Sequence, residues 1–408
     1  MFASYKVYMK KKLFLLPWIF YASLSFGNEI TLDYFLQKVK EQNLNLKLET
    51  AKQNASEEKA GGIRLPPPMF SFIQAKEDSG NSPSGFEVNQ EVPFPTKLKA
   101  NRSSRIYEAE AQKAMLSANQ NEILAKAKLS YIELWLMQER VEVIQQKKRI
   151  LEEHIRLSRS AVRSDSFLKI HLLKAESDLD LLENELESSK QTLKEKQLIL
   201  ADIINEDHQT FNPTAAEPPM STIPEINEGD NIPQLKSLRL GLEGMKERES
   251  EAKSSWLPDF NLKYKQMGAT SMSSRYNEVM IGITLPFIYF WQPNADAKTA
   301  NIETLQAELN LKREERNIDT RVATLYSKVE SLQKQLSNLK SKLIPRAHQR
   351  MKIVRNLAPR DMETIQDHRE TMEAFPELRM TELELRMQYE ESIAELEKYV
   401  ANKGQSHE

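Results

Sequence analysis

The stretch Phe86–Ile155 decides how the rest of the chain is read. Residues 86–92 read Phe-Glu-Val-Asn-Gln-Glu-Val, in which apolar and polar side chains alternate with the period of two that a strand with two unlike faces requires. Pro93-Phe94-Pro95 follows, and proline ends a strand because it cannot donate to the sheet. No glycine or proline then appears before Pro213. We therefore predict a short amphipathic strand that runs directly into a helix of about 65 residues, roughly 100 Å long.

The long predicted helix carries the apolar pattern of a coiled coil. Its apolar side chains lie on positions separated by alternating steps of three and four residues, at Ala127, Leu134, Met137, Val141, Ile144, Leu151 and Ile155, with Ser130 and Lys148 at the two positions between. Near residues 163–166 the pattern breaks, and it resumes at Leu168, Leu172, Ala175, Leu179, Leu182, Leu186, Leu193, Leu200 and Ile203. Two long helices joined by a few polar residues form an αα-hairpin.

The whole unit occurs twice. Leu65-Pro66 recurs 192 residues later as Leu257-Pro258, ahead of a further pair of alternating segments. Val92-Pro93-Phe94 recurs 193 residues later as Leu285-Pro286-Phe287, so Pro93 and Pro286 mark matching strand-to-helix junctions. A second seam follows at Val322, Leu325, Val329, Leu332, Leu336, Leu339 and Leu343. The repeat predicts a mainly α fold with a small β part, made of two copies of a β-hairpin followed by a long α-helical hairpin.

Composition and the first residues point to an exported protein of long helices. With 28% charged residues, only 11 glycines and a net charge of −2, the chain gives no reason to expect a nucleic-acid partner. The absence of cysteine excludes disulfides, thiolate metal sites and a lipid-modified cysteine. Lys10–Lys12 followed by an apolar run to Leu24 predicts a signal peptide at residues 1–27, cleaved after Gly27. The alternative, a membrane anchor, needs about 20 apolar residues, which this run lacks.

Each predicted hairpin has one apolar face, which we expect to meet lipid. The candidate lipid-facing positions are Phe86, Val88, Val92, Phe260, Leu262, Tyr264, Val279, Ile281 and Ile283. Known membrane barrels need at least eight strands, so a chain with four would have to form a homo-oligomer. The alternative is a soluble protein in which helices cover the apolar face. A helix that leaves in the strand's own direction is poorly placed to do so.

These features together resemble the TolC family of outer-membrane efflux proteins. The resemblance rests on the duplicated unit, the Leu-Pro before each hairpin, the Pro-Phe exits, and Leu172-Leu173-Lys174-Ala175-Glu176, which is similar to the family's Val-Leu-x-Ala-Glu signature. It implies a homotrimer with a twelve-stranded barrel in outer-membrane lipid and a helical tunnel through the periplasm. It also implies a periplasmic adaptor (membrane fusion protein) and an inner-membrane pump. The short hairpin loops are most similar to the branch that serves RND-type exporters.

The resemblance implies nine segments along the chain. They are the signal peptide (1–27), an N-terminal equatorial helix (28–63), the first β-hairpin (64–94), the first long helical hairpin (95–205), an equatorial connector (206–231), a second equatorial helix (232–255), the second β-hairpin (256–287), the second long helical hairpin (288–400) and a C-terminal tail (401–408). In this arrangement the helical hairpins end in tips that dock the adaptor.

The tips hold the candidate functional residues. Arg163, Ser164, Pro359 and Arg360 stand where relatives usually have glycine, and these are the candidate docking positions. Asp165, Asp361 and Glu363 are candidates for the aperture, because a ring of carboxylates at a constriction favours cations. The alternative is that these acidic residues only offset a helix dipole. Pro376 lies inside the last predicted helix, where we expect a kink or a break.

Catalytic chemistry finds no support in the sequence. The six histidines show no spacing typical of metal ligands, and no phosphate loop, nucleophile elbow or paired catalytic carboxylates occur. We therefore expect no cofactor, no metal site and no enzymatic activity. The leading interpretation is a passive exit duct of a tripartite efflux or type I secretion system. The alternative is a soluble periplasmic coiled-coil adaptor or tether.

Overall fold

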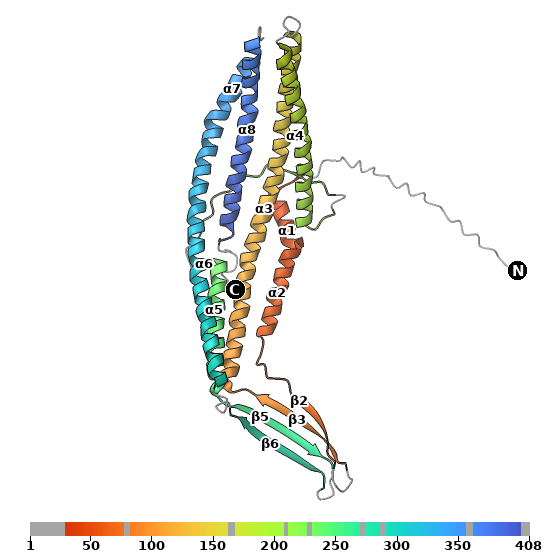
Figure 1. The fold of residues 1–408 in the computed structure, drawn as a ribbon, viewed down its shortest axis with the longest axis vertical. Coiled ribbons are helices and arrows are strands. Elements are labelled where there is room, and N and C mark those ends of the chain that lie inside the picture. Colours follow the sequence, from red (N-terminus) through yellow and green to blue (C-terminus); the bar gives the residue numbers. More distant parts are fainter. Residues whose placement is uncertain are drawn as a thin grey trace, which may run out of the picture.

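The computed structural model describes residues 29–76, 82–161, 168–207, 211–226, 231–269, 274–285, 291–355 and 362–400. Within these ranges the chain forms a long helical body with a small sheet at one end (Figure 1). The predicted fold class, mainly α with a small β part, is confirmed. The predicted cleavage position Gly27 and the junction residue Pro286 lie outside the described residues.

The longest helix, α3 (Pro95–Ala161), spans 67 residues and forms the spine of the body. It begins three residues after β3 (Ser84–Val92) ends, as predicted from the prolines. α4 (Leu168–Ile203) returns along α3 and completes the first helical hairpin (Figure 1). The predicted seam is confirmed between these two helices, where the buried residues are Val141, Ile144, Leu151, Ile155, Ala175, Leu182 and Leu186.

The second helical hairpin is less regular than the first. α6 (Trp291–Asn338) passes into a five-residue π-helical turn, Leu339–Leu343, which leads into α7 (Ile344–Arg355). α8 (Met362–Glu397) returns beside them. Buried side chains again form the seam, at Val329, Leu332, Leu336, Tyr389, Ile393 and Leu396.

The π-helical turn accommodates one extra residue. Before the turn, buried Val329 and Leu336 lie 195 residues after their counterparts Leu134 and Val141 in α3. Beyond the turn, buried Ala347 lies 196 residues after Leu151. A π-helical turn has one more residue per turn than an α-helix, so it keeps the apolar stripe on one face despite the insertion.

The predicted N-terminal equatorial helix (28–63) is instead two helices, α1 (Leu32–Gln42) and α2 (Leu44–Ala60). They meet at Asn43, whose side-chain oxygen accepts from the Leu46 N–H at 3.1 Å and whose amide donates to the Ile203 carbonyl at 2.8 Å. The first bond caps α2, and the second fixes it against the end of α4. Gly61 caps the C-terminal end of α2, and Gly62 has a positive φ of 67°.

The sequence predicts a kink or a break at Pro376. A break is wrong, because α8 is continuous from Met362 to Glu397, whereas a kink stays a prediction. Proline in a helix interior costs about 3 kcal/mol. Here the helix is held on both sides of Pro376, since Met372 and Leu383 are buried against neighbouring helices. Packing of the flanks outweighs the local cost.

The connector after α4 ties several helices together. Its strand β4 (Thr214–Ala215) pairs in parallel with β1 (Glu29–Ile30), and the Tyr131 hydroxyl of α3 lies within hydrogen-bonding distance of carbonyls at both. Further along, the Tyr389 hydroxyl donates to the Ser221 carbonyl at 2.8 Å, and the Tyr326 hydroxyl donates to the Pro224 carbonyl at 2.6 Å. The connector therefore fixes α3, α6 and α8 to one another at mid-length.

The sheet contains two hairpins side by side. β2 (Met69–Gln74) and β3 form the first, and β5 (Asp259–Met267) and β6 (Tyr276–Thr284) form the second. The strand order is β2-β3-β5-β6 with every pair antiparallel. α5 (Pro233–Lys253) and a 3₁₀ turn at Ser254–Trp256 lead into β5. The sheet lies beyond the end of the helical body (Figure 1).

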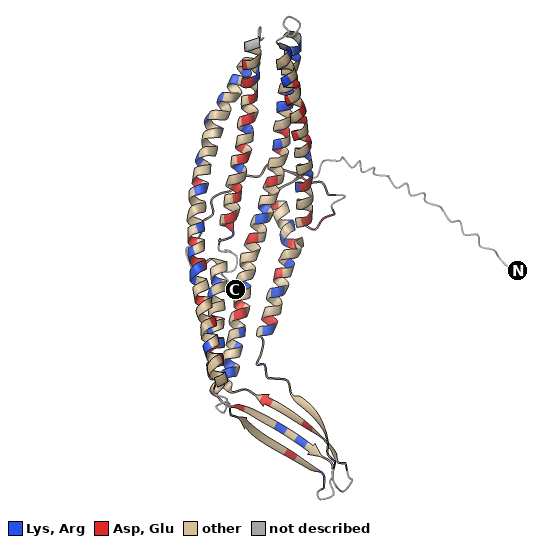
Figure 2. Ribbon diagram, in the orientation of Figure 1, with Lys and Arg blue, Asp and Glu red and all other residues tan. Residues whose placement is uncertain are grey.

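Charged residues are distributed unevenly between helices and sheet. Both signs are interspersed along the helices, whereas the strands carry few charges (Figure 2). Within the described ranges, no helix has both the length and the hydropathy needed to cross a membrane.

Candidate functional site: the sheet faces, the junction and the helix tips

The strand registers place all nine predicted lipid-facing residues on one face of the sheet. Directly opposite residues of antiparallel strands share a face. Val88 lies opposite Tyr264, which lies opposite Val279, so these three side chains form one row. A second row contains Val92, Phe260 and Ile283. The remaining three, Phe86, Leu262 and Ile281, lie on the same face. Whether this face meets lipid stays a prediction.

The apolar face is open to solvent in the single chain. Ile281 is 76% exposed and Phe72 71% exposed, values unusual for large apolar side chains in a water-soluble domain. Phe70 and Phe72 of β2 belong to the same face, because they pair with Val88 and Phe86. The sequence gives no signal for these two residues, since β2 has apolar residues on both faces and shows no alternation. The Phe70 and Phe86 rings stack with centroids 5.7 Å apart.

Gln90 is a polar residue within the rows of apolar side chains, and it is hydrogen-bonded. Its amide nitrogen donates to the Pro66 carbonyl at 2.8 Å. Pro66 belongs to the three-proline run before β2, which cannot pair with β3 through backbone N–H groups. The Gln90 side chain instead provides a hydrogen bond between β3 and this run. Gln266 and Asn277 are also polar and lie opposite each other on the same face, at the loop end of the second hairpin.

The opposite face of the sheet is polar. The Lys263 ammonium lies 2.8 Å from the Glu87 carboxylate across β3 and β5. Lys265 lies directly opposite both Glu87 and Glu278. Each hairpin therefore has one apolar and one charged face, and both signs of charge are paired across strands.

The junction between β3 and α3 is held by an acid of the second repeat. The Asp259 carboxylate accepts from the Phe94 N–H at 2.9 Å and from the Lys97 ammonium at 2.9 and 2.8 Å. The Lys97 ammonium also donates to the Leu257 carbonyl at 2.9 Å. These bonds fix the predicted junction residue Pro93 beside the start of β5. At the matching positions of the other half the sequence has Pro67 and Phe290, so the repeat gave no signal for this ion pair.

Removing this carboxylate is expected to loosen the junction. We expect Asp259→Ala to lower the free energy of unfolding by about 1–2 kcal/mol, because the Phe94 N–H and the Lys97 ammonium both lose an acceptor. Urea unfolding followed by circular dichroism would measure the change. Asp319→Ala, at an exposed position of α6, is the matched control and should change the stability little. Equal effects of the two substitutions would contradict a structural role for Asp259.

Most predicted tip residues lie outside the described residues, namely Arg163, Ser164, Asp165, Pro359, Arg360 and Asp361. Glu363 is in the first turn of α8, at the same end of the body. The structure therefore brings the two helix ends to one end of the molecule (Figure 1).

Close to the tips, an ion pair joins the two helical hairpins. The Arg369 guanidinium of α8 lies 2.9 Å from the Asp178 carboxylate of α4 and 2.9 Å from Glu373 of its own helix. The sequence gives no signal for this contact, because charged residues on long helices are most often solvated and nothing in the sequence pairs residues 178 and 369.

His154 of α3 is buried in the same region. Its side chain is 3% exposed, and its Nδ1 has no hydrogen-bond partner in the structure. Burial, reinforced by nearby Arg369 and His368 and opposed by Asp178, lowers the pKa of the imidazole from 6.5 to about 4. His154 is therefore neutral at pH 7. No group of three or more potential metal ligands occurs among the described residues.

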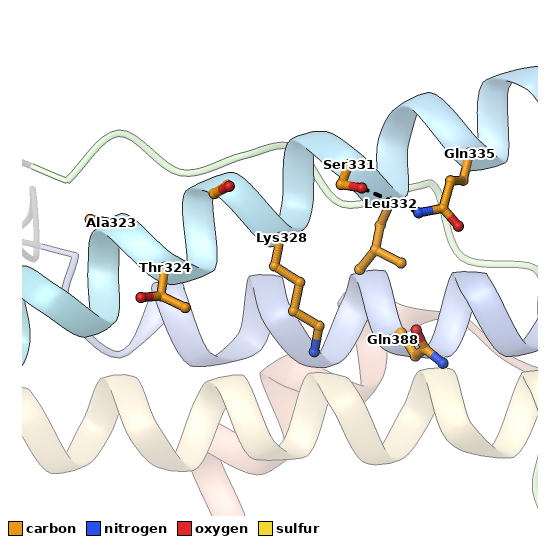
Figure 3. Close-up of a pocket in the computed structure, with 8 residues that line it drawn as sticks. Ala323, Thr324, Lys328, Ser331, Leu332, Gln335 and Gln388 are labelled. Atoms are coloured by element: carbon orange, nitrogen blue, oxygen red, sulfur yellow. Dashed lines mark hydrogen bonds between the residues drawn. The ribbon is translucent and has the colours of Figure 1, made fainter.

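A shallow groove runs between α6 and α8 (Figure 3). Its lining is mostly small or polar: Ala323, Thr324, Ser327, Lys328, Ser331, Leu332, Gln335 and Gln388. The Gln335 amide donates to the Ser331 hydroxyl at 3.2 Å. The groove is open along its length and contains no nucleophile paired with a base, so it gives no support for catalysis.

Comparison with solved structures identifies the fold. The chain is similar to the CmeC outer-membrane channel of Campylobacter jejuni, with a TM-score of 0.76 and 13% identity over 92% of this chain and 87% of that one. It is also similar to the open state of the MtrE outer-membrane channel of Neisseria gonorrhoeae, with a TM-score of 0.75 and 14% identity over 91% and 89%. The chain has the TolC-type channel fold.

The chain is also similar to the outer-membrane protein VceC of Vibrio cholerae, with a TM-score of 0.69 and 14% identity over 89% of this chain and 96% of that one. No protein-family model matches the sequence, and no curated protein is significantly similar to it. The TolC-type fold is thus shared across nearly the full length of each chain, although few residues are identical.

Proposed function

We propose that the chain is one protomer of a trimeric outer-membrane channel that forms the exit duct of a tripartite efflux or type I secretion system. The observation that supports this most is the one-sided apolar face on an open four-stranded sheet at the end of a long helical body. Apolar strands can meet lipid only in a closed barrel, because every backbone group must be paired there. Three copies would supply twelve strands, within the range of known barrels.

The partners follow from the two ends of this duct. The apolar face would contact outer-membrane lipid, and the polar face with Glu87, Lys263 and Lys265 would line the lumen. The helix tips, including Arg163, Ser164, Pro359 and Arg360, would dock a periplasmic adaptor connected to an inner-membrane pump of the RND type. The pump supplies the energy, and the duct conducts passively. No nucleic acid, cofactor or metal takes part.

The proposal is tested by fractionation and conductance. The expected result is a heat-resistant trimer in the outer-membrane fraction that forms ion-conducting channels in planar bilayers. A protein found wholly in the soluble periplasm as a monomer would overturn the channel proposal and favour the adaptor or tether. The tether alternative leaves the apolar face of the sheet without cover, which is why we prefer the channel.

We also propose that Glu363 lines the aperture at the tip, where three copies would form a carboxylate ring. Such a ring favours cations over anions. We expect Glu363→Ala in reconstituted trimers to reduce the cation-to-anion permeability ratio by at least about twofold and to weaken block by divalent cations.

Glu370→Ala is the matched control for this experiment. Glu370 lies two turns along α8 from Glu363 and is exposed. Unchanged selectivity in Glu363→Ala, or an equal change in both variants, would contradict the aperture assignment and leave the alternative that Glu363 only offsets the helix dipole.

A further inference from the structure

The two outer strands of the sheet each have one unpaired edge. β2 pairs only with β3, and β6 only with β5, within the residues that the structure describes. If three copies close a barrel, as proposed above, β6 of one copy must pair with β2 of the next. The internal repeat predicts which residues of β6 and of the neighbouring β2 lie opposite each other.

The two hairpins have the same register once the repeat is taken into account. The first strand of each hairpin is related by 192 residues and the second by 193. Phe72 and Phe86 are partners in the first hairpin. Shifting each by its own interval gives Tyr264 and Val279, which are partners in the second hairpin. The sequence intervals therefore describe the structural correspondence residue by residue.

The pairing between the hairpins can be transferred in the same way. Within one chain, β3 meets β5 with Val88 opposite Tyr264. The position that corresponds to Val88 in the second repeat is Ile281, and the one that corresponds to Tyr264 in the first is Phe72. We propose that β6 pairs with β2 of the neighbouring copy with Ile281 directly opposite Phe72. The same register places Met280 opposite Ile73 of the neighbour.

This seam keeps the two faces of the sheet continuous. Ile281 and Phe72 both lie on the apolar face, whereas Met280 and Ile73 both lie on the opposite face. A slip of one residue would move Phe72 to the polar side, because side chains alternate along a strand. The contact between β6 and the neighbouring β2 therefore has large apolar side chains on the apolar face, and Met280 and Ile73 form a second apolar contact on the opposite face.

The register also gives a reasonable barrel. Directly opposite residues can be followed from strand to strand around the barrel. Starting at Phe72, the successive partners are Phe86, Gln266 and Asn277, and then Lys76 of the neighbouring copy. The line of opposite residues therefore reaches the next β2 four residues further along that strand, a shear of four residues per copy. With a rise of about 3.3 Å per residue and a strand spacing of about 4.8 Å, three copies give a tilt of about 35°. Membrane barrels have tilts of about 35–45°. A two-residue slip would give about 19°, which is outside this range, or about 46°, which is at its upper limit. The tilt therefore disfavours the first slip, and the internal repeat distinguishes the proposed register from the second.

Because the chain has no cysteine, paired cysteines can test the register directly. The variant Ile281→Cys with Phe72→Cys should form a disulfide between neighbouring copies upon oxidation, since opposite Cα atoms lie about 4.5–5.5 Å apart, within the range for a disulfide. Met280→Cys with Ile73→Cys tests the other face. Residues 281 and 72 of one chain are separated by two intervening strands, so an intramolecular disulfide is excluded.

The matched controls combine Ile281→Cys with Phe70→Cys or with Gln74→Cys, which represent the two-residue slips. Diagonal neighbours lie about 7–8 Å apart and should cross-link poorly. We expect covalent trimers on denaturing gels at least about tenfold more abundant for 281/72 than for either control. Preferential linking of a control pair, or no linking of any pair in heat-resistant trimers, would overturn the register alone. Failure of the cysteine-free parent to form trimers would overturn the proposed function as well.

Discussion

Ile281→Arg is expected to prevent assembly of the protein in the outer membrane. Ile281 lies in the middle of β6 on the apolar face and is the most exposed large side chain of that face. Arginine on the lipid face near the bilayer midplane destabilises a barrel by about 2–4 kcal/mol, and a trimer would carry three copies. The amount of heat-resistant trimer in outer-membrane fractions would measure the effect, with a loss of at least about tenfold expected.

A residue on the other face provides a matched control. Asn261 of β5 faces the opposite side of the sheet, lies directly opposite Glu91 of β3, and is on an inner strand rather than at the contact between copies. Asn261→Arg should therefore still give trimers in the membrane. If both substitutions were tolerated equally, the apolar face would not meet lipid. If both abolished assembly, the difference between the two faces of the sheet would not be the cause.

Acid is expected to loosen the contact between the helical hairpins near the tips. The pKa of His154 is about 4 in the packed structure and 6.5 for an ordinary histidine. A lowered pKa means that packing favours the neutral imidazole, so this contribution is complete above about pH 6.5 and is lost as the pH falls toward 4. The expected decrease in the free energy of unfolding is about 2–3 kcal/mol per copy. Thermal unfolding of the purified protein at pH 7 and pH 4.5 would measure it.

The charged groups around His154 determine how this experiment is controlled. Arg369 and His368 face it from α8, and Asp178 and His171 face it from α4. Carboxylates elsewhere also titrate in acid, so the comparison is between variants. His154→Gln should be less sensitive to acid than the parent, whereas His348→Gln, in α7 and outside this group of residues, should behave like the parent. Identical acid sensitivity of His154→Gln and the parent would contradict the role of His154.

The fold was predictable because its determinants are periodic. Buried Leu134, Ile144 and Leu182 belong to a pattern of apolar residues spaced by three and four, which is typical of two helices packed as a hairpin. The prolines at the strand ends mark the strand-to-helix junctions. The registers then placed all nine predicted apolar residues on one face of the sheet. Patterns of this kind are local, and local patterns can be read from a single sequence.

The contacts that escaped prediction join residues far apart in the chain. Asp259 meets Lys97, and Arg369 meets Asp178, and nothing in the sequence near either residue indicates its partner. Pro376 shows the reverse case, in which a strong local signal for a helix break is overridden by packing on both sides. Asn43 was missed because the helical apolar pattern continues on both sides of it, although asparagine is a favoured N-cap, and its bonds to Leu46 and Ile203 mark the break.

The π-helical turn at Leu339–Leu343 has a consequence for the history of this protein. The matching part of the other repeat lies within α3, which is helical without such a turn from Pro95 to Ala161. The repeat interval is 193 at the junction (Pro93 to Pro286) and 196 at Ala347, so the second half is three residues longer over this stretch, and the turn accommodates one of the three. The two halves have therefore not kept equal length since the duplication. Relatives in which both helices have equal length from junction to tip should have an uninterrupted α-helix at this position.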